Sequence, residues 1–132
     1  MKIKKILIIG SSGMLGKKLS TTIKKNKDYD VITCSRQKEN NKNHYQLDLD
    51  DLDCENFIKG IQPDVVVYCA GKTNVDLCDK NKKSAMHINA TVPATIAKFS
   101  NYFIYISTDC LYADKKGAYD DRDWETLVFP AQ

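Results

Sequence analysis

The sequence predicts an α/β fold built on a doubly wound parallel sheet. Three observations favour this fold: five short apolar runs rich in β-branched residues, helical patterns between them, and a glycine-rich turn after the first run. Strands and helices that alternate in this way form βαβ units, whose parallel strands are covered by helices on both faces. The 132 residues are enough for one domain with its own core.

The five apolar runs are the expected strands, and their lengths are typical of strands. The runs V-V-V at 65–67 and F-I-Y-I at 103–106 are continuously apolar, as strands buried on both faces are. In chain order, the expected strands cover residues 3–9, 31–34, 44–47, 64–69 and 102–107.

Three helical patterns separate the strands, each with its apolar residues on one face. Pro93 falls inside the third pattern and predicts a kink or a restart of that helix. The polar stretch at 36–43 predicts a surface loop after the second strand. The three faces are formed by Leu15, Leu19, Thr22 and Ile23, by Leu52, Phe57, Ile58 and Ile61, and by Ala85, Ile88, Val92, Ile96 and Phe99.

Three glycines, Gly10, Gly13 and Gly16, follow the first strand at a spacing of three. A loop that binds the diphosphate of a dinucleotide needs this order of strand, glycine turn and helix. The glycines allow the sharp turn, the approach of the diphosphate to the backbone, and close packing of the helix on the sheet. The helix N-terminus adds free N–H groups and a partial positive charge. The spacing is one residue longer than in the commonest fingerprint, and a strand-to-helix turn without a ligand is the alternative interpretation.

The charge and the cysteine content argue against several classes of function. The net charge of +3, from 20 Lys and Arg against 17 Asp and Glu, is too small to indicate a nucleic acid or a membrane as partner. Five cysteines without a C-x-x-C pair, and only two histidines, predict neither a metal site nor a disulfide scaffold. Free thiols fit a reducing cytoplasm. The first apolar run is broken by Gly10, so it is too short for a signal peptide, and no run reaches transmembrane length.

The glycine loop is one of five segments that together resemble the N-terminal part of an extended short-chain dehydrogenase/reductase. The others are L-D-L at 47–49, P-D-V-V-V-Y-C-A-G-K-T-N-V-D at 63–76, H-I-N-A at 87–90 and I-S-T-D-C at 106–110. Within that superfamily the chain most resembles the dTDP-4-dehydrorhamnose reductase branch. The resemblance implies a Rossmann-type sheet, with a cofactor-binding domain over residues 1–121 and an unmatched tail over residues 122–132.

The resemblance also implies that the chain binds NADP, with NAD as the alternative cofactor. The glycine loop would hold the diphosphate, residues 48–49 the adenine, and the turn at 69–71 the nicotinamide ribose. Asp48 has a second interpretation, because the cluster of aspartates around it is typical of the start of a helix. The residues expected to bind the cofactor are Gly10, Ser12, Gly13, Met14, Leu15, Gly16, Ser35, Arg36, Asp48, Leu49, Cys69, Ala70, Gly71 and Thr73.

The end of the second strand distinguishes between the two cofactors. A domain that binds NAD places a carboxylate there for the ribose hydroxyls, but this chain has Ser35 and Arg36. The planar guanidinium group offers several donors to a 2′-phosphate, so the sequence favours NADP. A loop arginine that points into solvent is the alternative interpretation.

Thr108 matches the family's catalytic Ser/Thr, whose hydroxyl would donate to the carbonyl of the substrate and stabilise developing charge. It follows the fifth expected strand, at the end of the sheet where α/β folds bind their ligands. A strand-end threonine that satisfies local backbone groups is the alternative. The resemblance places Val75, Asp109 and Cys110 beside the substrate, and Asn89 as a brace of the active-site backbone.

One feature of the family is missing from this sequence. No Tyr-x-x-x-Lys pair follows Thr108 at the expected distance, since Tyr112 and Lys116 have this spacing but come too early, within the loop after the strand. The family's proton donor and the lysine that lowers its pKa therefore have no match in this sequence. We therefore expect a chain that is truncated before the substrate-binding region and inactive alone. The strand at 102–107 would then form a hydrophobic edge, and self-association into a homo-oligomer is expected.

The resemblance implies the cofactor-binding part of a reductase that transfers hydride from NADPH to a keto group of a nucleotide sugar, as in dTDP-rhamnose biosynthesis. Two alternatives remain open at this point. One is a non-catalytic regulatory module that binds a dinucleotide, and the other is a nucleotide-sugar epimerase or dehydratase of the same superfamily. A Tyr-x-x-x-Lys pair in a longer form of the protein would favour the enzyme over the module.

Overall fold

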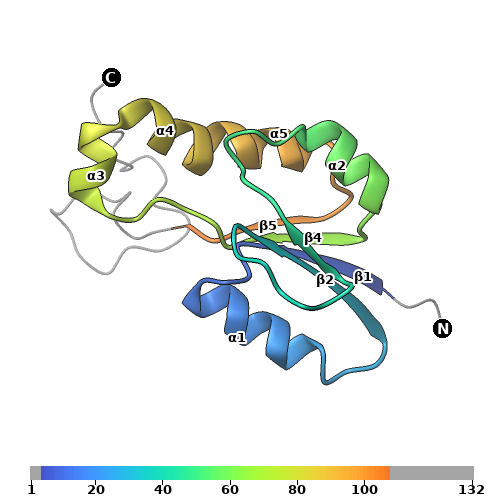
Figure 1. Ribbon diagram of the computed structural model, residues 1–132. Coiled ribbons are helices and arrows are strands. Elements are labelled where there is room, and N and C mark those ends of the chain that lie inside the picture. The colour runs from blue at the N-terminus through green and yellow to red at the C-terminus, as the bar shows by residue number, and fades with distance from the viewer. Residues whose placement is uncertain (1–3, 108–132) are drawn as a thin grey trace, which may run out of the picture.

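The computed structural model describes residues 4–107, which form one sheet between two layers of helices (Figure 1). Every pair of neighbouring strands is parallel, and the predicted fold class is confirmed. The strands, in the order in which they lie across the sheet, are β3 (His44–Gln46), β2 (Tyr29–Ser35), β1 (Lys4–Ile9), β4 (Val65–Tyr68) and β5 (Phe103–Tyr105).

This strand order makes the sheet doubly wound. From β1 the chain moves outward through β2 to β3, and it then returns to place β4 on the other side of β1. Open α/β sheets bind their ligands at such a reversal, beyond the carboxyl ends of the strands. The glycine loop leaves β1 at this reversal, so the topology alone places the loop at the expected ligand site.

The two faces of the sheet bury alternate residues of the same strand, because successive side chains point to opposite faces. Leu7 and Ile9 of β1 belong to the larger core cluster, together with residues of α2 (Cys54–Ile61) and α5 (Val92–Lys98). Ile6 and Ile8 of β1 pack with α1 (Met14–Ile23) in a smaller cluster. Figure 1 shows the two layers, with α1 on one side of the sheet and α2 and α5 on the other.

A long helical segment on the α2 side of the sheet leads from the loop after β4 towards β5. It consists of α4 (Lys82–Met86), a π-helical turn η1 (His87–Thr91) and α5. Pro93 lies in the first turn of α5, where proline is well tolerated because the first N–H groups of a helix have no partner within it. The π turn changes to an α-helix next to this proline, at the place where the sequence predicted a kink or a restart.

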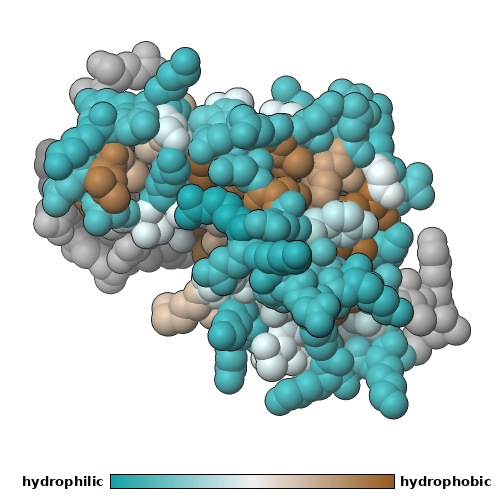
Figure 2. All heavy atoms as spheres, viewed as in Figure 1, coloured by the Kyte–Doolittle hydropathy of each residue, from teal (hydrophilic) through white to brown (hydrophobic). Residues whose placement is uncertain are grey.

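The short helix α3 (Val75–Lys80) precedes this segment and buries none of its residues. Its Val75 and Leu77 are exposed, and Figure 2 shows an apolar patch at this end of the molecule. Across residues 4–107, no helix is long and apolar enough to cross a membrane.

Two helix starts differ from the predictions. In α1, Leu15 is exposed, and the buried position is Gly16, where the helix lies closest to the turn after β1. In α2, the N-cap is Asp53 and not Asp48, because the carboxylate of Asp53 accepts a hydrogen bond of 3.1 Å from the amide of Asn56. The position at which the backbone turns into α2 decides which aspartate of the segment 48–53 caps the helix.

Candidate functional site

A cleft of about 250 Å³ lies beyond the carboxyl ends of β1, β2 and β4. Its position is the one expected from the reversal of the strand order. Most of the residues predicted to bind the cofactor line it: Gly10, Ser12, Gly13, Ser35, Arg36, Asp48, Leu49, Cys69, Ala70 and Gly71. It is also lined by residues to which the sequence assigned no role in the site: Ile9, Cys34, Leu47, Asp50, Lys72 and Ile88.

The fold itself requires two of the three glycines. Gly10 has a φ of +86°, in the region that favours glycine, and a Cβ there would lie 2.6 Å from the amide nitrogen of Ala70. A Cβ on Gly16 would lie 2.3 Å from the carbonyl oxygen of Gly10. A side chain at either position would push the turn away from the strand, or the helix away from the turn.

Gly13 has no such neighbour. Its φ is −71°, and a Cβ there would meet only the carbonyl oxygen of Gly10, at the ordinary contact distance of 3.5 Å. The residue lines the cleft, so the space beside its Cα is open to a ligand. The fold therefore does not require a glycine at this position, whereas a ligand that closely approached the backbone would require one.

The N-terminus of α1 offers hydrogen-bond donors next to this space. The helix begins directly after Gly13 and has no side-chain cap. Among the described residues, no carbonyl or side chain accepts a hydrogen bond from the amides of Ser12, Met14 or Leu15. Free N–H groups at a helix N-terminus, together with the helix dipole, form a binding site for an anion such as a phosphate group.

The end of β2 forms one wall of the cleft. The carbonyl oxygen of Cys34 accepts hydrogen bonds from the amides of Gly10 and Ser11, at 3.0 and 3.1 Å, so the glycine loop is tied to β2. Ser35 is buried, whereas Arg36 is exposed. Within residues 4–107 no carboxylate lies within ion-pair distance of the Arg36 guanidinium, which is therefore available to an anionic ligand.

The segment after β3 completes this side of the cleft. Asp48 is exposed, and its carboxylate accepts a hydrogen bond of 3.1 Å from the amide of Asp50. Leu49 packs against the larger core cluster and also lines the cleft. Together the two residues present an apolar surface with a carboxylate beside it, a combination that suits a flat, partly polar base.

The loop after β4 forms the opposite wall and is held by the π turn. The side chain of Asn89 accepts a hydrogen bond from the amide of Lys72 at 2.8 Å and donates one to its carbonyl oxygen at 2.9 Å. The π turn is itself held, because the hydroxyls of Tyr68 and Tyr105 donate to the carbonyl oxygens of Ile88 and Asn89, at 2.7 and 2.9 Å. Asn89 thus braces the backbone beside the cleft, as the resemblance implied.

Burial keeps the thiols of the cleft protonated near neutral pH. It raises the pKa of Cys34 to about 12, and a hydrogen bond with the Gly10 backbone offsets this only in part. Burial also raises the pKa of Cys69. The thiolate is the reactive form of cysteine, so both residues act here as apolar lining. No cluster of side chains within residues 4–107 could hold a metal ion.

Some predicted site residues are not part of the cleft. Thr73 and Val75 lie exposed beyond the braced loop, and the side chains of Met14 and Leu15 are exposed to solvent although their backbone amides lie beside the cleft. The predicted residues that do not line the cleft are Met14, Leu15, Gly16, Thr73 and Val75. The predicted residues Thr108, Asp109 and Cys110 lie outside the part of the chain that the structure describes.

Only some of the cleft residues without a predicted role could have been identified from the sequence. Ile9 is the last residue of β1 and pairs with Cys34 near the end of β2, so their position at the carboxyl edge of the sheet was a usable signal. Ile88 gave no signal, because its place in the cleft depends on the π turn. Lys72 stands next to the predicted Gly71, but a charged residue in a loop is usually solvated, and nothing in the sequence distinguished it.

The sequence of the chain is similar to a known family and to several known proteins. The profile of the RmlD substrate binding domain family matches residues 4–126. Methionine adenosyltransferase 2 subunit beta of Danio rerio is 30% identical over 126 residues, which are 91% of this chain and 38% of that protein. The dTDP-4-dehydrorhamnose reductase of Aggregatibacter actinomycetemcomitans is 25% identical over 130 residues, which are 90% of this chain and 40% of that protein. The chain therefore spans about 40% of the length of the curated relatives it matches.

Solved structures share the fold. The crystal structure of a hypothetical dTDP-4-dehydrorhamnose reductase from Sulfolobus tokodaii has a TM-score of 0.79 and 34% identity, over 90% of this chain and 44% of that chain. The dTDP-4-dehydrorhamnose reductase from Bacillus anthracis, solved in complex with NADP, has a TM-score of 0.73 and 25% identity, over 89% of this chain and 40% of that chain. The resemblance predicted from the sequence is confirmed.

Proposed function

Since the chain belongs to the RmlD substrate binding domain family, we propose that it is the NADP-binding part of an oxidoreductase that reduces a keto group of a nucleotide sugar. The observation that carries the proposal is the cleft at the reversal of the strand order, which is lined by the glycine loop and by Arg36. The similarity to dTDP-4-dehydrorhamnose reductases, one of them solved with NADP, supports both the cofactor and the class of substrate.

The residues of the cleft fit a dinucleotide. The open space beside Gly13 and the free amides at the start of α1 are what a diphosphate requires. Arg36 would hold the 2′-phosphate, and Asp48 and Leu49 would contact the adenine. The turn at 69–71, braced by Asn89 through the neighbouring residue, would lie beside the nicotinamide ribose.

NADPH, when bound, supplies a hydride for the carbonyl carbon of the substrate. The chain's own contribution to that step is assigned to Thr108, whose hydroxyl would donate a hydrogen bond to the carbonyl oxygen and stabilise its developing negative charge. Val75, Asp109 and Cys110 are assigned to contacts with the sugar. These assignments rest on the match of the sequence segments to the reductase branch.

Arg36 provides the test of the cofactor. The chain should bind NADPH more tightly than NADH, because only NADPH carries the 2′-phosphate. Arg36→Ala should remove most of this preference, since a hydrogen bond to a charged group contributes about 1.5–3 kcal/mol. Titration calorimetry of both proteins with both cofactors measures the effect. Equal affinities in the unmutated chain would contradict the preference, and binding of neither dinucleotide would overturn the proposed function.

One comparison favours a second candidate function, a dinucleotide-binding module without catalysis. The relative that is 30% identical to this chain is named as a subunit of methionine adenosyltransferase, not as a reductase. The two functions share the cofactor site and differ in turnover. Oxidation of NADPH by a longer form of the protein in the presence of a keto sugar would favour the reductase, and binding without oxidation would favour the module.

We also propose the cytoplasm as the compartment of the protein and a nucleotide sugar as its ligand besides the cofactor. Every described cysteine is a free thiol, which fits a reducing environment. A disulfide of the protein that had formed in vivo, detected on a non-reducing gel of freshly lysed cells, would contradict this assignment.

A further inference from the structure

We propose that Lys72 is a second cationic contact of the dinucleotide and that its ammonium group binds a phosphate oxygen of the diphosphate. The inference rests on the proposed function, because it assumes that the cleft binds a dinucleotide. The sequence segments that resemble the reductases assigned no role to this residue. The proposal rests on the place of Lys72 in the cleft, on its free charge and on the position of the other lysines.

The basic residues that line the cleft are Arg36 and Lys72, and they lie on opposite sides of it. Arg36 follows β2 and Lys72 follows β4, while β1 and its glycine loop lie between these two strands. A dinucleotide whose 2′-phosphate contacts Arg36 and whose diphosphate lies over the loop therefore has its nicotinamide half, and the phosphate that carries this half, on the side of Lys72.

The acidic residues of the cleft lie on the far side from Lys72. Asp48 and Asp50 follow β3, which is separated from β4 by both β2 and β1. Among the residues that line the cleft, the positive charge of Lys72 and the negative charges of Asp48 and Asp50 therefore lie on opposite sides. This distribution of charge favours a phosphate near the loop after β4.

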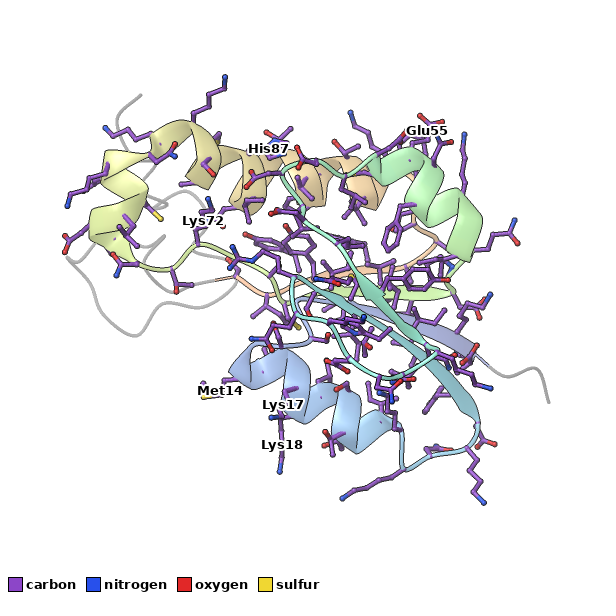
Figure 3. The ribbon with its side chains drawn as sticks, viewed as in Figure 1. Met14, Lys17, Lys18, Glu55, Lys72 and His87 are labelled. Carbon is purple, nitrogen blue, oxygen red and sulfur yellow. The ribbon has the colours of Figure 1, made fainter. Side chains whose placement is uncertain are left out.

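Two lysines closer to the glycine loop in sequence are placed differently. Lys17 and Lys18 belong to α1, are exposed, and do not line the cleft. Figure 3 shows both on the part of α1 that faces away from the sheet, whereas Lys72 extends from the loop after β4 towards α4. Among the described lysines, Lys72 is the one that lines the cleft.

The ammonium group of Lys72 is positioned but not neutralised. The side chain of Asn89 holds both backbone groups of Lys72, at 2.8 and 2.9 Å, so the base of the side chain is fixed. Its Nζ donates to the hydroxyl oxygen of Ser84, a neutral acceptor. Within residues 4–107 no carboxylate lies within ion-pair distance of it. A phosphate oxygen is a stronger acceptor for an ammonium group than a hydroxyl, so a ligand can displace Ser84 as its partner.

The test is titration calorimetry of Lys72→Met, Lys72→Arg, Arg36→Ala and the matched control Lys18→Met with NADPH, NADH and ADP-ribose. All three ligands share the diphosphate, so Lys72→Met should weaken each of them by roughly tenfold or more. Lys72→Arg should keep most of the affinity, because it keeps the charge. Arg36→Ala should weaken NADPH alone, and Lys18→Met should bind like the parent.

A second readout is the dependence on salt, because an exposed charge pair is screened by ions. Between low and high salt, Lys72→Met should lose less affinity than the parent does. The side chain of Lys72 is exposed and is not part of the Asn89 brace, so both Lys72 variants should melt like the parent without ligand.

Three outcomes would overturn the inference. If Lys72→Met binds NADPH as tightly as the parent, the inference fails and the proposed function stands. If the loss is confined to NADPH and NADH while ADP-ribose binds normally, Lys72 contacts the nicotinamide end and not the diphosphate. If the parent binds none of the three ligands, the proposed function fails and the inference fails with it.

Discussion

A side chain at each of the three loop glycines would meet different surroundings. At Gly10 and Gly16 it would meet backbone atoms at 2.6 and 2.3 Å, but at Gly13 it would meet only one atom at 3.5 Å. The three residues are equivalent in the sequence pattern, because spacing cannot show what surrounds a Cα. The structure separates two glycines that the fold needs from one that the fold does not need.

Gly13→Val should abolish dinucleotide binding and leave the fold intact. The backbone at this position, with a φ of −71°, accepts any residue, but the added side chain would occupy the space of the diphosphate. The variant should melt close to the parent and gain no stability from NADPH, whereas a ligand-binding protein does gain it. Differential scanning fluorimetry with and without NADPH measures both effects.

Gly16→Ala is the matched control for this substitution. Its Cβ would press on the carbonyl oxygen of Gly10, so it should destabilise the fold itself by about 1–3 kcal/mol. If Gly13→Val is still stabilised by NADPH as strongly as the parent, the loop does not bind the diphosphate.

At the scale of the element, the start of α2 (Cys54–Ile61) depends on a single carboxylate. Asp53 accepts hydrogen bonds from the backbone amide and the side chain of Asn56, at 3.1 and 2.7 Å, and these bonds lower the pKa of its carboxyl below the usual 3.8. A carboxyl whose pKa is lowered by folding stabilises the fold above its usual pKa. That stability is lost as the pH falls below that value towards the lower pKa of the folded state.

Asp53→Asn tests this contribution. Asparagine still accepts from the helix amide but does not titrate, so it is a good N-cap at every pH. The melting temperature of the parent should therefore fall more steeply than that of the variant as the pH drops from about 5 to about 3. Thermal melts followed by circular dichroism across this range compare the two. Parallel curves would show that the cap of α2 does not depend on the charge of Asp53.

The helices were predictable to different degrees for physical reasons. Pro93 marks the restart before α5 in any context, because proline lacks the N–H that a helix interior needs. The π turn at His87–Thr91 could not be predicted, because hydroxyls of Tyr68 and Tyr105 on distant strands bind its carbonyl oxygens. The brace that Asn89 provides was expected only from the resemblance, since its partner Lys72 is 17 residues earlier in the chain.

At the scale of the molecule, the alternation of strands and helices was sufficient to predict the sheet. The position of the cleft follows as well, because a doubly wound sheet has its reversal where the first loop leaves β1. The charge pattern inside the cleft does not follow from the sequence. It depends on which loop residues from three separate segments, after β2, β3 and β4, meet around the loop.

The strand β5 lies at one end of the described sheet, and its surroundings predict self-association. Tyr102, Ile104 and Ile106 are all exposed, and an exposed apolar edge strand is a template for pairing with another chain. Sedimentation velocity at increasing concentration should show reversible association. Ile104→Lys should shift the equilibrium towards the monomer, since a charge on an edge strand opposes pairing. A parent that stays monomeric at every concentration would contradict the prediction.

The 132-residue chain should bind NADPH and yet show no appreciable turnover of a keto sugar. All the elements of the proposed cofactor site belong to the described sheet and its loops, so binding should not need more of the protein. Turnover needs a proton donor in reach and a region that positions the sugar. No Tyr-x-x-x-Lys pair follows Thr108 at the expected distance, because Tyr112 and Lys116 come too early, and the chain spans about 40% of the length of its curated relatives.

Loss of both the proton donor and the positioning should lower the rate by many orders of magnitude. The measurement is the oxidation of NADPH, followed at 340 nm, with dTDP-4-dehydrorhamnose and related keto sugars as substrates. The full-length dTDP-4-dehydrorhamnose reductase from Bacillus anthracis is a suitable positive control, and calorimetry with NADPH shows that the short chain is folded and loaded. Rapid oxidation by the short chain would mean that one of its own groups supplies the proton. Tyr112 and Tyr119 would then be the first residues to replace by phenylalanine, because both follow Thr108 in the sequence and carry a phenolic hydroxyl.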